Sequence, residues 1–477
     1  MKRSSGVLLH ISSLNGEYSC GSFGKEALSF VDFLSDSGFR YWQVLPFCLP
    51  DECNSPYKSY SAFSLNPYFI DLESLCEEGL ITKSELEGAR QTTPYLCEFD
   101  RLKNERLTLL SRAAERFHNE KALEDFFKTH KKTEQFCTFM ALKASNNGAE
   151  WREWTLHTPD EATLRLWRFT QYVFYKQWSR VKAYANSKGI SIIGDVPIYV
   201  SLDSSDVWSD REQFQLDQRN NPVNVAGVPP DYFSEDGQLW GNPLYDWKKM
   251  KSDGFAWWKE RMSFMTELFD GVRIDHFRGI ESYYSIPASS KTAKNGKWIK
   301  GPGMAFVKAI KEVCGDKLII AEDLGVITDK VAKLVRDSGF PGMRVLQFAF
   351  LGDENSPHLP HNYPDNCVAY TGTHDNNTLL GYIWELDSEN RKKLFDYCGY
   401  VGNDWDNSYE SIMRMMYSSH ASLLVMPIQD ILFYGKDTRF NTPGNADGNW
   451  SYRVTRAQLE KIDRDRIAKW NKTYGRS

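Results

Sequence analysis

The sequence has few features of membrane, secreted or nucleotide-binding proteins. None of its apolar runs approaches the ~18 residues of a membrane-spanning helix. Near the amino terminus, the apolar run from Val7 to Leu9 ends at His10 and is too short for a signal peptide. The phosphate-binding motifs GxGxxG and GxxxxGK[ST] and the zinc-protease motif HExxH are absent. The sequence therefore predicts a cytoplasmic protein, and it gives no support for nucleotide binding or zinc-protease activity.

Charge and cysteine usage exclude further classes. The chain has 58 Lys and Arg against 63 Asp and Glu, a net charge of −5, so it lacks the basic surface that nucleic acid or anionic membranes require. Nine cysteines, an odd number without a CxxC pair, indicate reduced thiols rather than disulfides or a zinc site. With 41% hydrophobic and 25% charged residues, the composition is typical of a globular protein.

Eight short apolar segments alternate with segments of helical periodicity. The strand candidates are residues 6–11, 41–47, 190–200, 269–278, 317–325, 342–350, 366–375 and 423–432. Such alternation indicates parallel strands joined by helical crossovers. Eight of them predict an α/β fold, a (β/α)8 TIM-type barrel forming a single catalytic domain over residues 1–477. On the pattern alone, a doubly wound open sheet is the alternative.

Three segments interrupt this alternation. Residues 51–161 are predicted to form an inserted, mainly helical subdomain, because Lys, Glu and Leu recur at helical spacing and a structureless loop of that length is improbable. Residues 201–246 and 279–303 are rich in turn-forming residues and are predicted to be inserted substrate-binding loops. Trp240 and Trp298 in these loops are candidates for stacking on a ligand, although most tryptophans belong to the core.

Four acidic residues follow the predicted strands at their carboxyl ends: Asp195, Asp275, Glu322 and Asp375. In a TIM barrel this end carries the active site, so the four side chains are expected to converge. Any one of them could instead cap a helix. In the stretch FDGVRIDHFR, Arg273 and Asp275 point to the same face of a strand, so Arg273 can hold Asp275 ionised, although a purely structural ion pair fits as well.

Acidic groups gathered without a basic patch suit a neutral substrate that passes through a cationic transition state, as in glycosidic bond cleavage. Asp275 beside Arg273 is the candidate anion, and Glu322 in the apolar stretch IIAEDLG is the candidate acid with a raised pKa. Because His276 and His374 adjoin acids, a metal site is the competing hypothesis. It is disfavoured because adjacent strand residues face opposite ways. His374 is expected to bind sugar hydroxyls, and His276 either does the same or is a core histidine.

Ten stretches carry a resemblance to one family. They are GVLLH, WQVLP, SPYKSYSAFSLNPY, GDVPIYV, VPPDYFSEDGQLWGNPLYDW, GVRIDHFRG, IIAEDLG, GFPGMRVLQFAF, YTGTHDNNT and NTPGN. The sequence resembles the 4-alpha-glucanotransferases called amylomaltase or disproportionating enzyme, relatives of alpha-amylase. The resemblance implies a retaining double displacement on maltooligosaccharides and other α-1,4-glucans, without a cofactor. By this likeness Asp275 is the nucleophile, Glu322 the acid/base and Asp375 the transition-state stabiliser.

The resemblance also assigns binding roles around these acids. Arg273 and His374 occupy supporting positions. Contacts with glucan are implied for Asp195, Ser55, Tyr57, Gln238, Trp240 and Asn441. Two stretches depart from the family pattern, HISSLNG in place of HPTSLPG and Trp450 with Tyr452 in place of the usual aromatic pair, and neither includes a catalytic acid. A hydrolase using water as acceptor is the alternative within the class. An inactive glucan-binding barrel would be expected to have lost one of the three acids.

Overall fold

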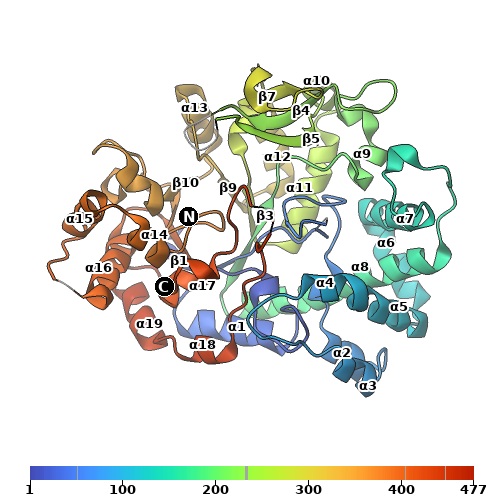
Figure 1. Ribbon diagram of the computed structural model, residues 1–477, viewed down its shortest axis with the longest axis horizontal. Helices are drawn as coiled ribbons and strands as arrows, with labels where there is room; N and C mark the ends of the chain where they lie inside the picture. The colour runs from blue at the N-terminus through green and yellow to red at the C-terminus, as the bar shows by residue number, and fades with distance from the viewer. Residues whose placement is uncertain (51, 231–234, 403, 446) are drawn as a thin grey trace.

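A closed barrel of eight parallel strands lies at the centre of the molecule (Figure 1). The computed structural model describes residues 1–50, 52–230, 235–402, 404–445 and 447–477. The strand order around the barrel is β1-β12-β11-β10-β9-β6-β3-β2. The bounds are β1 Ser4–Leu8, β2 Tyr41–Gln43, β3 Ser191–Val196, β6 Gly271–Ile274, β9 Leu318–Ala321, β10 Gly342–Val345, β11 Cys367–Tyr370 and β12 Leu423–Pro427. Each lies inside or beside a predicted strand segment, which confirms the predicted TIM-type barrel.

Helices surround the barrel. The longest of those described, α8 (Glu161–Ser187), begins where Asp160 caps the amide of Thr163 and leads into β3. The others outside residues 51–161 are α1 Lys25–Asp36, α9 Ser205–Ser209, α10 Trp247–Ser252, α11 Ala256–Leu268, α12 Met304–Cys314, α13 Asp329–Ser338, α14 Leu379–Glu385, α15 Ser388–Tyr397, α16 Trp405–Ser418, α17 Ile428–Ile431, α18 Arg456–Glu460 and α19 Arg464–Thr473. The carboxyl-terminal segment thus contains two short helices, α18 and α19.

Residues 52–161 are largely helical and lie to one side of the barrel (Figure 1). Their helices are α2 Leu72–Glu77, α3 Lys83–Gly88, α4 Phe99–Arg101, α5 Leu107–Arg116, α6 Glu120–Thr129 and α7 Lys131–Ser145, with a π-helical turn, η3, at Leu102–Arg106. Buried residues of this region, such as Leu110 and Phe127, belong to the same hydrophobic core as the barrel strands. The region therefore packs as an extension of the barrel core.

The two segments predicted as loops contain strands. β4 (Asn224–Val228), β5 (Gln238–Pro243), β7 (Ser282–Pro287) and β8 (Lys297–Lys300) form a separate antiparallel sheet in the order β5-β4-β7-β8. This sheet, called the flap sheet below, has its own small apolar cluster of Val225, Tyr284, Ile286 and Ala293. The expectation of loops over 201–246 and 279–303 is wrong in this respect, because paired strands from both segments satisfy each other's backbone groups.

The strand predicted at residues 269–278 is shorter in the structure. β6 ends at Ile274, and His276 then adopts a left-handed conformation with φ +48°. A 3-10 turn, η6 (Phe277–Ile280), follows directly. Asp275 and His276 therefore stand on a turn at the end of the barrel rather than on a continuing strand, so strand alternation does not apply to this pair.

A buried arginine, Arg476, ties the carboxyl-terminal segment to the barrel. β1 pairs with β12 over five residues, and this pairing closes the barrel. The guanidinium of Arg476 is fully buried and donates to the carbonyls of Ser4, Tyr417, Ser419 and Ala421. These bonds satisfy backbone oxygens that would otherwise be buried without partners.

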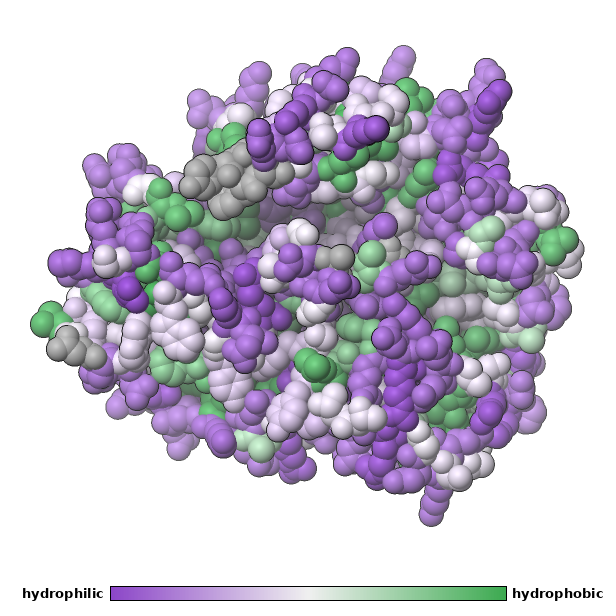
Figure 2. Space-filling view, in the orientation of Figure 1, coloured by the Kyte–Doolittle hydropathy of each residue, from purple (hydrophilic) through white to green (hydrophobic). Residues whose placement is uncertain are grey.

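The surface shows no broad apolar area on the face in Figure 2, where hydrophobic residues occur in small separate groups among hydrophilic ones. Within the described ranges, none of the helices has both the length and the apolar character needed to cross a membrane.

Candidate active site

The predicted acids gather at the carboxyl ends of four barrel strands. Asp195 is in β3, Asp275 directly follows β6, Glu322 directly follows β9, and Asp375 lies in the loop after β11. A cleft of about 350 Å³ opens at this end. It is lined by Ser55, Tyr57, Lys58, Pro197, Ile198, Tyr199, Trp240, Asn242, Asp275, His374, Asp375, Asn441, Pro443 and Trp450. Seven residues singled out from the sequence thus line one cleft.

Arg273 lies beneath the cleft and joins two of the acids. Its Nη1 donates to both oxygens of Asp195 at 2.8 Å, and its Nη2 donates to Oδ1 of Asp275 at 2.7 Å. Burial opposes the charge of Arg273, but the two carboxylates raise its pKa well above the ordinary value. The side chain of Asp195 is fully buried, whereas that of Asp275 is 29% exposed. Asp275 is therefore the anion of this pair that a substrate can reach.

A second chain of contacts runs from Asp195 to Asp375. The Tyr57 hydroxyl donates to Oδ2 of Asp195 at 2.6 Å and lies 3.4 Å from Nδ1 of His374. The Tyr57 and His374 rings stack with centroids 4.9 Å apart. Nε2 of His374 lies 3.2 Å from Oδ2 of Asp375. Because the Tyr57 hydroxyl donates its hydrogen bond to Asp195, it can only accept one from Nδ1 of His374. This geometry therefore favours a doubly protonated imidazole.

The pKa values along this chain agree with that geometry. Burial disfavours a charged His374, but the adjacent Asp375 outweighs it and raises the pKa of the imidazole. For Asp375, desolvation is outweighed by His374 and by the amide of Asn441, which donates to Oδ1 at 2.6 Å, and its pKa falls to about 2. Asp375 is therefore a fixed anion at neutral pH, and its side chain is 48% exposed to the cleft.

The environment of Glu322 raises its pKa, whereas that of Asp375 lowers its pKa. Burial and then the negative charge of Asp275 raise its pKa to about 7, although Arg273 and two backbone amides act against this. Those amides are His276 N, 2.6 Å from Oε2, and Leu324 N, 2.8 Å from Oε1. At neutral pH the Glu322 carboxyl is thus close to half protonated, while the carboxylate of Asp275 is paired with Arg273. A carboxyl of raised pKa beside an ion-paired carboxylate is the combination that acid/base catalysis requires.

The remaining predicted residues lie around the rim. The Trp240 ring stands nearly perpendicular to that of His276, with centroids 5.0 Å apart, and its Nε1 donates to Oε1 of Gln238 at 3.0 Å. Burial lowers the pKa of His276 to about 4, so its ring is neutral at pH 7. Its Nε2 is buried without a hydrogen-bond partner among the described residues. Gln238 and His276 are beside the cleft rather than in its lining.

Sequence reasoning missed two aromatic residues of the cleft as site residues. Tyr199 follows β3 and lies 6.2 Å from Trp240 between ring centroids. Trp450 has its ring 5.9 Å from both Tyr57 and His374. Both occur in or beside stretches used for the resemblance, and Trp450 was noted there only as a departure from the pattern. Their positions depend on how distant loops pack, which periodicity does not reveal.

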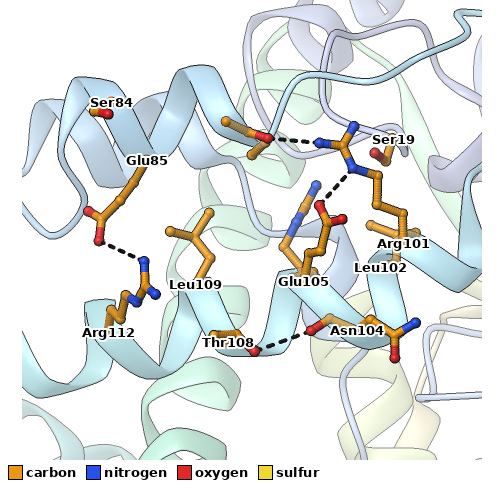
Figure 3. Close-up of a pocket in the computed structure, with 13 residues that line it drawn as sticks. Ser19, Ser84, Glu85, Arg101, Leu102, Asn104, Glu105, Thr108, Leu109 and Arg112 are labelled. Atoms are coloured by element: carbon orange, nitrogen blue, oxygen red, sulfur yellow. Dashed lines mark hydrogen bonds and ion pairs between the residues drawn. The ribbon is translucent and has the colours of Figure 1, made fainter.

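A larger cavity, about 450 Å³, lies among the helices of residues 51–161 and is drawn in Figure 3. Four of its charged side chains form ion pairs with one another: Arg101 Nε lies 2.7 Å from Glu105, and Arg112 lies 3.5 Å from Glu85. None of the acids at the strand ends reaches it. The smaller cleft at the barrel mouth is therefore the candidate active site. In the part of the chain that the structure describes, no group of three or more His, Cys, Asp or Glu residues is arranged to hold a metal ion.

Comparison with known proteins shows the family to which the chain belongs. The family model described as 4-alpha-glucanotransferase matches residues 9–459. A 4-alpha-glucanotransferase of Clostridium butyricum is 41% identical over 98% of this chain and 100% of its own length. One from Streptococcus pneumoniae is 44% identical over 96% of this chain and 94% of its own length.

A solved structure extends the likeness to the fold. Amylomaltase from Streptococcus agalactiae, determined in complex with acarbose, has a TM-score of 0.95 and 37% sequence identity, with each chain covered completely. A family match over nearly the whole chain, relatives above 40% identity and a shared barrel all agree. The chain belongs to the 4-alpha-glucanotransferase family.

Proposed function

We propose that this enzyme moves segments of α-1,4-glucan between maltooligosaccharides or longer chains by a retaining double displacement. The observation that carries the proposal is the pair Asp275 and Glu322, neighbouring carboxyls of which one is ion-paired and the other has a raised pKa. A retaining mechanism needs this combination of nucleophile and acid/base. We expect the two carboxyl groups to lie about 5 to 5.5 Å apart when substrate is bound.

In the first step, a carboxylate oxygen of Asp275 attacks the anomeric carbon of the donor as the bond to the leaving O4 breaks. Glu322 gives its proton to that O4, so the released sugar leaves neutral and Glu322 becomes a carboxylate. The charge that develops on the sugar ring is stabilised by the anion of Asp375, whose low pKa keeps it ionised. Arg273 and Asp195 hold Asp275 in position.

In the second step, Glu322 takes the proton from an acceptor hydroxyl, whose oxygen attacks the anomeric carbon and releases Asp275. Water competes at about 55 M, so a transferase must bind its acceptor sugar beside the intermediate. Trp240, Gln238 and the unpartnered Nε2 of His276 offer a stacking surface and hydrogen-bonding groups for a neutral sugar. We propose that they form the acceptor site, with the flap sheet as its support. Ser55, Tyr57, His374 and Asn441 contact the donor in the cleft.

The test is incubation with maltotriose, followed by product chromatography and a reducing-end assay. Transfer predicts glucose together with maltopentaose and longer chains, with little gain in reducing ends. If maltotriose instead yields glucose and maltose with reducing ends rising in proportion, the enzyme is a hydrolase and the acceptor site is wrongly assigned.

Two further proposals concern ligand and location. The related Streptococcus agalactiae amylomaltase was solved with acarbose, and we infer that acarbose binds in the cleft of this chain and inhibits it competitively.

We also propose that the protein works in the cytoplasm. Five of the cysteines are free thiols buried among apolar side chains, as suits a reducing compartment: Cys20, Cys97, Cys137, Cys314 and Cys367.

A further inference from the structure

Arg278 is a buried cation beside the catalytic centre that the mechanism above does not use. It lies in η6, three residues after Asp275, and only 6% of its surface is exposed. One face of its guanidinium packs against the ring of Trp298 in β8, with 3.8 Å between Cζ and the ring centroid. Its Nη1 donates to the carbonyl of Val326. Arg278 thus touches the flap sheet and the segment after β9 at once.

The Val326 carbonyl belongs to the turn that follows Glu322. Within this turn, the amide of Leu324 donates to Oε1 of Glu322 at 2.8 Å, and Gly325 takes a left-handed conformation with φ +84°. The backbone angles of residues 324 to 326 set the orientation of the Leu324 amide relative to the Val326 carbonyl. A bond that fixes the Val326 carbonyl therefore also fixes the amide that holds one oxygen of Glu322.

The other oxygen of Glu322 is held from the opposite side. His276 N donates to Oε2 at 2.6 Å, and Phe277 N donates to the backbone carbonyl of Glu322 at 3.0 Å. Both amides belong to the segment that leads into Arg278. The acid/base is thus clamped between η6 and the turn 322–326, and Arg278 bridges these two segments from its own position in η6.

Arginine suits this position better than lysine. Its planar guanidinium can lie flat on Trp298 while one N–H points at a carbonyl, whereas a lysine ammonium offers no planar face. Burial lowers the pKa of Arg278, and the tryptophan ring compensates by cation–π attraction. Trp298 is 38% exposed, and its ring also contacts that of Tyr284, with centroids 5.1 Å apart. Trp298 therefore covers the bridge from outside.

We propose that Arg278 is a positioning residue for the acid/base: through Val326 it sets the turn that aims the carboxyl of Glu322 at the leaving oxygen. The inference rests on the proposed role of Glu322. Since a misplacement of about 1 Å can cost about 100-fold in rate, Arg278→Met is expected to lower transfer from maltotriose about 100-fold.

The distinguishing measurement uses a donor that needs no acid. Fluoride leaves α-maltosyl fluoride without taking a proton from the enzyme, so its release under single-turnover conditions, with enzyme in excess, reports attack by Asp275 alone. For Arg278→Met we expect this rate to stay within about threefold of wild type. The conservative Arg278→Lys should lose transfer activity to a similar extent, because it cannot stack and donate together.

Two controls make the result specific. Arg106 is another buried arginine that donates only to carbonyls among its recorded bonds, those of Tyr18, Tyr68 and Ile70, away from the cleft. Arg106→Met should change both rates alike and lower thermal stability. Trp298→Leu, at a partly exposed position, keeps the bond to Val326 and should show a smaller selective loss. It tests the bridge even where Arg278→Met fails to fold.

The inference is overturned if Arg278→Met, or Trp298→Leu in its place, slows maltotriose transfer and fluoride release equally, or slows neither. Glu322→Ala, measured in parallel, tests the foundation. If Glu322→Ala transfers from maltotriose at the wild-type rate, the proposed role of Glu322 fails whatever Arg278 does. If Glu322→Ala shows the selective loss and the Arg278 variants do not, only the inference on Arg278 fails.

Discussion

Replacing Arg273 by Met tests the charge network beneath the cleft. The guanidinium is the partner of Asp195, whose side chain is fully buried. Without Arg273, the Asp195 carboxylate would keep the hydrogen bond from the Tyr57 hydroxyl but lose its cation. Methionine has a similar length and no charge. The variant thus removes one half of a buried ion pair and leaves the other half in place.

The expected loss is large. Removing one partner of a buried ion pair typically costs about 3–5 kcal/mol, because an uncompensated charge stays buried. With an unfolding entropy of about 2.1 cal/mol/K per residue, the 477 residues give about 1 kcal/mol/K. The thermal midpoint of Arg273→Met should therefore fall by about 3–5 °C, measured by scanning calorimetry at one fixed scan rate.

A second substitution separates the buried charge from lost packing. Asp195→Asn in the Arg273→Met background removes the unpaired carboxylate, so the double variant should be more stable than the sum of the single effects predicts. The pH dependence gives an independent check. Burial raises the pKa of Asp195 in the folded protein, so its contribution to stability is present at low pH and is lost as pH rises.

Without Arg273, the stability lost at Asp195 as pH rises should be larger, because no cation then compensates the buried carboxylate. The gap in thermal midpoint between wild type and Arg273→Met is expected to widen between pH 5 and pH 8, and the double variant should not show the widening. Additive effects of the two substitutions, together with a gap that does not change with pH, would refute the argument that Arg273 compensates a buried Asp195 charge.

Other predictions follow from single contacts. Asp275→Ala should keep the wild-type thermal midpoint within a few degrees and lose turnover by several orders of magnitude, whereas Asp195→Ala should keep part of the activity; equal losses would mean that the roles are misassigned. Trp240→Ala should lower transfer from maltotriose more than hydrolysis, as measured by the ratio of longer products to new reducing ends. Asp430, buried and accepting from Thr371 and Leu379, has its pKa raised to about 7 by burial. Asp430→Asn should therefore gain stability relative to wild type as pH rises from about 4 to 7 and level off above that, and a gap in thermal midpoint that stays constant over this range would contradict it.

The barrel could be predicted because each of its strands leaves a local mark. A buried parallel strand is a continuous apolar run, and the helix after it has its own period, so eight repeats are visible without any tertiary information. The strands of the flap sheet show no comparable local pattern in the sequence. Strand β5, QLWGNP, contains Gly and Pro. The paired strands β4 and β7 of the same sheet are more than 50 residues apart in the sequence, so their pairing is non-local.

The candidate site likewise has one part that the sequence pattern predicts and one part that depends on tertiary contacts. Asp275, Glu322 and Asp375 could be located because acids at strand ends stand out against apolar runs. The clamp on Glu322 could not, since it depends on backbone amides and on a left-handed conformation at His276, which is uncommon outside glycine. The catalytic and binding roles of these residues stay predictions until the kinetic tests above are made.

The pairing of β1 with β12 has a consequence for how the protein is made. Strand β12 leaves the ribosome about 415 residues after β1, which at 5–20 residues per second is about 20 to 80 s. In the barrel β1 pairs with β2 on one side and with β12 on the other, so until β12 is made this second edge of β1 lacks its native partner. Ser4–Leu8, fully buried in the finished barrel, then exposes backbone groups that can pair with another chain. Crowded synthesis therefore exposes the protein to misassembly at its first strand until the barrel closes.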